Sequence, residues 1–158
     1  MKLWLALALA LPSLAPRAAD FCVRCHAAQV RDFKTHPHRA YGLNCQSCHG
    51  ESARHRLSKG AVPPDRVAEP EEVPALCGGC HARQLKSYSI SEHARLLFER
   101  SEVEAPNCAT CHGVHKLLTA NQTERRCLSC HSASFAGPSP PVKGKVSCMH
   151  CHSPHSSE

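Results

Sequence analysis

Apolar residues are concentrated at the amino terminus of this chain and are scattered through the rest of it. Residues 3–11 form an unbroken apolar run that follows Lys2 and ends at Pro12. A run of this length is typical of a secretory signal and is too short to span a bilayer. We therefore predict a signal peptide over residues 1–19, with an uncleaved membrane anchor as the alternative. Export would place the protein in the periplasm or at the cell exterior, peripheral to a membrane at most.

Helical patterning in the remaining chain is short and local. It predicts helices over Ala27–Lys34, Ala82–Ser87 and Ser91–Arg100, and Ser91 is a suitable N-cap for the third. Residues 96–98 of that helix are apolar, and they pack either on a flat apolar cofactor or against an ordinary helix face.

Linkers are predicted between the helical parts. Residues 57–76 hold four prolines, residues 119–126 are polar, and residues 138–141 hold three prolines. These segments divide the chain without creating separate domains, and we expect one domain over residues 20–158.

One pentapeptide accounts for every cysteine. Cys-x-x-Cys-His occurs six times and uses all 12 cysteines, and it is the attachment sequence for c-type haem. Two thiols add to the two vinyl groups of one haem, and the histidine that follows supplies the proximal nitrogen to the iron. The predicted attachment residues are Cys22, Cys25, Cys45, Cys48, Cys77, Cys80, Cys108, Cys111, Cys127, Cys130, Cys148 and Cys151, and the proximal ligands are His26, His49, His81, His112, His131 and His152.

Two other interpretations of the cysteines compete with this one. Zinc ribbons also use pairs of Cys-x-x-Cys, and exported chains often form disulfide scaffolds. Neither explains a histidine after every second cysteine. Six covalent haems c explain both residue types, and we predict no catalytic residue.

The composition predicts a fold built around these cofactors. Aromatic residues make up only 4% of the chain, which is too few for an ordinary core, and small domains need other means of stabilisation. We expect short α-helices and mostly irregular chain wrapped around a stacked haem core, with little or no β structure.

The motifs fall into an internal repeat. The segment CVRCHAAQVRDFKTHPHRA from Cys22 aligns with CGGCHARQLKSYSISEHAR from Cys77, and each runs on to a CHG motif and a further histidine. A third pair of motifs is shortened and ends in CHSPH. The three predicted haem pairs span residues 20–60, 75–118 and 124–158.

Seven histidines lie outside the proximal positions, enough to give each of six irons a second histidine. Five of them occupy repeated positions and are the predicted distal ligands. His36 is preferred over His150 as the sixth, because His150 lies between the cysteines of its own motif. Met149 also lies between two cysteines, so histidine–methionine ligation is not expected. The predicted distal ligands are His38, His55, His93, His115, His155 and His36.

The net charge of +6 does not predict a nucleic-acid partner. Removal of Lys2 and Arg17 with the signal peptide leaves +4. Six haems add about −12 from their propionates. Basic side chains are therefore expected to pair with propionates or to lie on the solvated surface.

The chain resembles the multihaem cytochromes c of respiratory electron transfer. The unit CHAAQVRDFKTHPHRAYGLNCQSCHGESARH looks like the repeats of decahaem cytochromes that conduct electrons through outer-membrane porin conduits. It is also similar to the pentahaem donors of nitrite reduction, and the CHGVH and CHSPH ends look like the doubled C-x-x-C-H family. The resemblance implies closely stacked bis-histidine haems that form a conducting wire.

Three functions are compatible with these features. The first is a periplasmic or extracellular electron carrier in anaerobic or extracellular respiration. Its donor would be a quinol dehydrogenase or small cytochrome, and its acceptor a reductase, an outer-membrane conduit or a mineral. The second is a reductase of nitrite, hydroxylamine or a sulfur compound with one open haem. The third is a subunit of an oligomeric conductive filament.

Overall fold

The computed structural model describes residues 21–132 and the single residues 148, 152 and 155. The predicted signal peptide and the 138–141 loop lie outside the described residues, as do Cys151 and His150.

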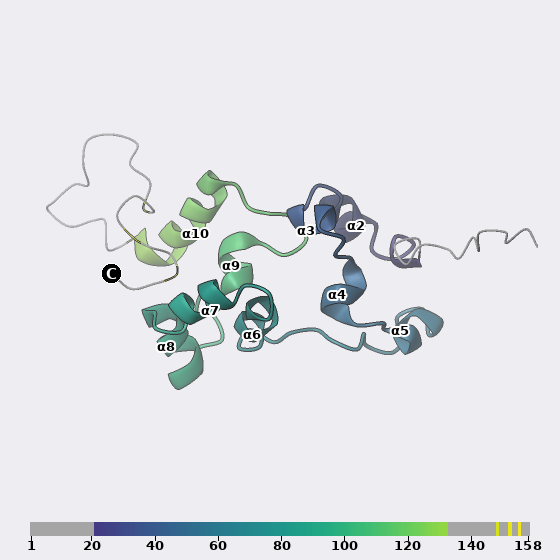
Figure 1. The fold of residues 1–158 in the computed structure, drawn as a ribbon, viewed down its shortest axis with the longest axis horizontal. Coiled ribbons are helices and arrows are strands. Elements are labelled where there is room, and N and C mark those ends of the chain that lie inside the picture. Colours follow the sequence, from purple (N-terminus) through teal and green to yellow (C-terminus); the bar gives the residue numbers. More distant parts are fainter. Residues whose placement is uncertain (1–20, 133–147, 149–151, 153–154, 156–158) are drawn as a thin grey trace, which may run out of the picture.

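Short helices joined by irregular chain make up the described structure, and no strand occurs in residues 21–132. Figure 1 shows that the helices are distributed along the long axis, with α2 to α5 in one half and α6 to α10 in the other. The helices are α2 (Ala27–Phe33), α3 (Pro37–Ala40), α4 (Cys45–His49), α5 (Ala53–Leu57), α6 (Val73–Gly78), α7 (Ala82–Tyr88), α8 (Glu92–Glu99), α9 (Cys108–His112) and α10 (Ala120–His131).

The three helices predicted from the sequence are present. Helices α2, α7 and α8 match the predicted spans to within one residue at each end. Ser91 caps α8, because its Oγ accepts the N–H of Ala94 at 3.2 Å. The expected class of short helices with irregular connections is confirmed.

The prediction of a polar linker over residues 119–126 was wrong, because α10 covers most of this segment. Thr119 and Gln122 form a capping box, in which the Gln122 side chain accepts the Thr119 N–H at 2.8 Å and Thr119 Oγ1 accepts the Gln122 N–H. Such reciprocal bonds satisfy free N–H groups at a helix start. No glycine or proline interrupts the helix, which continues through the fifth Cys-x-x-Cys-His motif.

In both full repeats, the second Cys-x-x-Cys-His motif forms a short helix that begins after an asparagine and ends at a glycine. Asn44 and Asn107 cap α4 and α9, and each asparagine Oδ1 accepts two backbone N–H groups. Gly50 and Gly113 end the two helices with φ of 71° and 74°. A positive φ favours glycine, so both CHG glycines are needed for the chain to leave its helix in this direction.

A small protein core lies in the second repeat. Tyr88, Ala94, Leu97 and Ala105 are its buried apolar residues, and the Tyr88 hydroxyl donates to the carbonyl of Pro106 at 2.8 Å. Leu97 therefore packs against protein, whereas Phe98 is 48% exposed. The core is too small to organise the whole chain, as the low aromatic content predicts.

Candidate haem-binding sites

Histidine rings meet in pairs along the described chain. In each pair, a histidine that completes a Cys-x-x-Cys-His motif faces a histidine outside the motifs, with ring centroids about 6 Å apart. The pairs are His26–His55 (6.0 Å), His49–His115 (6.1 Å), His81–His38 (5.8 Å), His131–His93 (6.0 Å) and His112–His155 (5.9 Å).

The spacing within a pair fits two axial ligands of one metal ion. The Nε2 atoms of His38 and His81 are 3.5 Å apart. Two imidazoles on opposite sides of a metal ion hold their nitrogens about 4 Å apart, since each metal–nitrogen bond is roughly 2 Å. Groups of three or more metal-binding side chains do not occur among the described residues. The motif histidine, the histidine opposite it and the two cysteines of the same motif are the donor set that haem c requires, whereas a tetrahedral zinc site would gather at least three such side chains at one point.

Backbone carbonyls fix the tautomer of two of these histidines. His49 Nδ1 lies 3.0 Å from the carbonyl oxygen of Arg66, and His55 Nδ1 lies 2.7 Å from that of Val62. A carbonyl oxygen only accepts, so each Nδ1 carries the proton and each Nε2 keeps the lone pair that a metal requires. Hydrogen bonds of this kind orient metal-binding histidines.

The predicted linker over residues 57–76 is shorter in the structure, because α6 covers its last four residues. The part between α5 and α6 supports the site, since it provides both carbonyl groups. It is attached to the start of α5 by a reciprocal contact, in which the Ser52 N–H donates to Asp65 Oδ2 at 2.6 Å. The Asp65 N–H in turn donates to Ser52 Oγ at 3.0 Å. Sequence reasoning missed these supporting residues, because a carbonyl has no signature in the sequence.

The pairs connect one repeat to the next. His38 of the first repeat faces His81 of the second, and His115 of the second faces His49 of the first. The same exchange joins the second repeat to the third through the pairs His131–His93 and His112–His155. Among these five pairs, His26–His55 alone lies within one repeat. The histidine pairs therefore interlock the three repeats.

Burial favours the neutral form of several of the paired rings. It lowers the pKa of His93, His112 and His115, and the nearby ring of the paired histidine lowers each pKa further. A metal binds the neutral imidazole, so a lowered pKa favours ligation.

Two expected positions lie apart from these pairs. His36 is 5% exposed and lies beside His38, with ring centroids 4.7 Å apart, rather than opposite a proximal histidine. His152 is exposed, and none of the described histidine rings is paired with it. The structure thus arranges ten of the twelve predicted iron ligands into pairs and leaves these two outside them.

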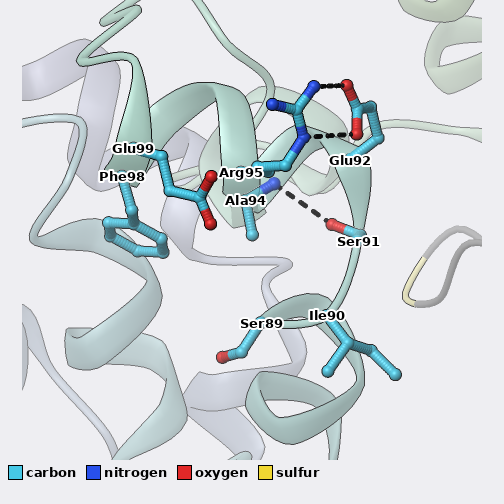
Figure 2. Close-up of a pocket in the computed structure, with 8 residues that line it drawn as sticks. All are labelled: Ser89, Ile90, Ser91, Glu92, Ala94, Arg95, Phe98 and Glu99. Atoms are coloured by element: carbon cyan, nitrogen blue, oxygen red, sulfur yellow. Dashed lines mark hydrogen bonds and ion pairs between the residues drawn. The ribbon is translucent and has the colours of Figure 1, made fainter.

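A surface hollow of about 290 Å³ lies beside α8 (Figure 2). The ion pair between Arg95 and Glu92 lies at its edge, and Ile90 and Phe98 add apolar surface. It contains no cysteine or histidine, so it is not part of the sites described above.

These features define a multihaem cytochrome c, in which paired histidines flank cysteine pairs on a frame of short helices. The model of the family described as cytochrome c7 and related cytochrome c matches residues 30–113, which is more than half of the chain. The chain therefore belongs to this family. A second model, described as cytochrome c554 and c-prime, matches residues 76–153.

Curated relatives include the C-type polyheme cytochrome OmcB from two strains of Geobacter sulfurreducens. Each is 34% identical over 70 residues, covering 38% of this chain and 9% of the relative. The match thus spans less than a tenth of the length of these relatives. No solved structure matches the chain.

Membership in this family indicates that the cofactor is covalent haem c and that the general role is electron transfer. None of the helices in the described chain has the length and apolar character needed to cross a membrane.

Proposed function

We propose that this protein binds six covalent haems and carries electrons between partner proteins in the periplasm or at the cell exterior. The observation that carries the proposal is the set of histidine pairs, each joining a motif histidine to a histidine elsewhere in the chain. Two protein ligands per iron leave no position open for a substrate at those five sites. Such sites suit electron transfer rather than catalysis at the metal.

The electrostatic interactions between cysteines support a linear arrangement of the six haem sites, in the order of their motifs along the sequence. Burial and the neighbouring Cys45 raise the pKa of Cys22, and the pKa of Cys48 is raised by burial and then by Cys77. Cys77 and Cys108 share a hydrogen bond that raises the pKa of Cys77 and lowers that of Cys108 to about 7.

The series continues into the third repeat. Burial and the nearby Cys127 raise the pKa of Cys111, and the pKa of Cys148 is raised by burial, by Glu124 and by Cys127. Each motif thus has a cysteine close to a cysteine of the next motif. This order favours entry of electrons at one end of the chain and exit at the other.

The bound haem supplies one-electron chemistry, and the chain supplies ligation and position. The paired histidines would hold the iron from both sides of the haem. The carbonyls of Arg66 and Val62 hold two of the ligand rings in the required tautomer. The interlocked repeats hold successive attachment motifs side by side.

The proposed donor is a membrane quinol dehydrogenase or a small cytochrome, and the proposed acceptor is a reductase, an outer-membrane conduit or a mineral. A signal peptide over residues 1–19 would deliver the chain to the compartment where these partners occur. Association into an oligomer or filament would extend the same path across several copies.

The proposal is tested on holo-protein matured in a bacterium that attaches haem c. Intact-mass analysis should show six added haems, and electron paramagnetic resonance of the oxidised protein should show mainly low-spin iron. A chemically reduced sample should then reduce a second cytochrome in stopped-flow mixing. Fewer than six haems would overturn the count, and the absence of transfer to any redox protein would overturn the carrier role.

A reductase remains the alternative for one site, and the exposed His152 is the observation that favours it. Nitrite or carbon monoxide added to the reduced protein separates the two functions. Binding by one haem with turnover of nitrite supports the reductase, whereas unchanged spectra support a carrier at all six sites.

A further inference from the structure

We propose that His36 is a positioning residue that caps α3 and orients the axial ligand His38, and that it does not bind iron itself. The sequence favoured His36 as the sixth distal ligand, and the geometry points to another role. The inference rests on the proposed function only in taking His38 as the ligand opposite His81.

The His36 ring is held by three contacts. Its Nδ1 accepts the backbone N–H of His38 at 3.2 Å, which makes His36 the N-cap of α3. One face of the ring stacks on Phe33, with centroids 5.3 Å apart and planes 16° apart. The ring also lies against that of His38 and is 5% exposed. A ring with these contacts is fixed in place beside the predicted ligand.

The internal repeat shows that this is a capping position. His36 follows Cys25 by eleven residues, and Ser91 follows Cys80 by the same number. Ser91 is 6% exposed, and its side chain accepts a backbone N–H at the start of α8. The two residues therefore play the same part in the two repeats.

The predicted ligands follow these caps at the same distance. His38 lies two residues after His36, and His93 lies two residues after Ser91. Each ligand thus occupies the first turn of a capped helix. Since serine cannot serve as the equivalent iron ligand, the feature common to the two repeats is the cap.

The tautomer of His36 also opposes ligation. A backbone N–H only donates, so His36 Nδ1 has no proton and the neutral ring carries its proton on Nε2. His49 and His55 have the opposite arrangement, with Nδ1 protonated and Nε2 available. For His36 to bind iron through Nε2, its proton would have to move to Nδ1, and the cap on α3 would be lost.

Orientation of His38 has a direct consequence for the site. His38 Nε2 lies 3.5 Å from His81 Nε2, across two repeats and 43 residues of sequence. Helix α3 has four residues, so its own hydrogen bonds hold His38 weakly. The cap supplies the missing constraint on His38, and the Phe33 stack holds the capping ring in place.

The test compares His36→Asn, His36→Ser and His36→Ala in the full holo-protein, with His38→Ala as the ligand control. Asparagine and serine are good N-caps and alanine is not, and serine reproduces the second repeat. Electron paramagnetic resonance counts high-spin irons, and titration with cyanide measures how readily an axial histidine is displaced.

We expect the asparagine and serine variants to keep the wild-type spin count and cyanide affinity. The alanine variant should keep its haems but bind cyanide at one haem about five-fold more tightly, the factor expected from the loss of one N-cap. His38→Ala should gain one high-spin iron.

Other results separate the ways in which the inference could fail. One new high-spin iron in all three His36 variants would show that His36 is a ligand and overturn the inference. Unchanged cyanide affinity in His36→Ala would overturn the positioning role. If His36→Ala does not mature, the asparagine and serine variants still decide between cap and ligand. No new high-spin iron in His38→Ala would instead reject the proposed ligation by His38.

Discussion

Replacement of Gly113 by alanine probes the turn that presents His115. Gly113 ends α9 with φ of 74° and ψ of 168°, a region that only glycine occupies readily. A Cβ at this position would lie 2.3 Å from the backbone oxygen of Lys116, whereas real Cβ contacts are essentially never under 3.0 Å. The turn must therefore move by at least 0.7 Å, the difference between these two distances.

This displacement acts on the residue next to a predicted ligand. His115 immediately precedes Lys116, and its ring faces His49 with centroids 6.1 Å apart. The backbone strain alone costs about 1–3 kcal/mol. We expect Gly113→Ala to lower the free energy of unfolding by about 3 kcal/mol, the upper end of that range, because the clash adds to the strain.

The change in the spin state of the iron should appear at a motif far from Gly113 in the sequence. Because His115 faces His49, the haem attached in the second motif should gain high-spin character, although the mutation follows the fourth motif. Electron paramagnetic resonance of the oxidised protein and thermal unfolding followed by haem absorbance measure the two effects.

Gly42→Ala is the matched control. Gly42 also has a positive φ, of 81°, but the position that a Cβ would occupy there has no contact within 4 Å. We expect a loss of about 1 kcal/mol from the left-handed backbone alone and unchanged spectra. Equal effects of the two substitutions would refute the argument that the Lys116 contact positions His115.

Three further predictions follow from the other supporting contacts. His115→Ala should give one high-spin iron, at the haem attached to the second motif. Peptide mapping combined with ligand binding identifies the affected haem, and an effect at the fourth motif would contradict the pairing. Thr119→Ala should lose about 1 kcal/mol with the cap of α10, detected as faster amide exchange in its first turn, while the exposed neighbour Asn121→Ala should not. Ser58→Ala removes the hydroxyl that accepts the Val62 N–H at 3.0 Å and donates to the His55 carbonyl. One haem potential should therefore shift. A redox titration that matches wild type would show that the Ser58 hydrogen bonds do not orient His55.

The interlocked pairs also bear on how the repeats assemble. A single repeat contains two motif histidines, but most of the facing histidines come from a neighbouring repeat. His38 of the first repeat faces His81 of the second repeat. An isolated first repeat would therefore contain His38 without the histidine that it faces. Under the proposed ligation, the repeats depend on one another to complete each iron site.

Local features of the sequence predicted local structure well. The N-cap Ser91 and the short periodic segments predicted helices α7 and α8 to within a residue, because capping and periodicity act within one or two turns. The α10 segment was missed because its polar residues suggested a linker, while the Thr119–Gln122 capping box was the signal that would have identified the helix.

The sequence by itself determined the attachment chemistry, since a cysteine pair and the adjacent histidine lie within one turn of chain and need no distant residue. It also determined the repeat and the supply of spare histidines. The tertiary structure alone decided which spare histidine faces which motif, because partners such as His38 and His81 are 43 residues apart. It also decided that His36 lies at a helix cap and that two linker carbonyls set ligand tautomers, since both depend on the path of the backbone in space.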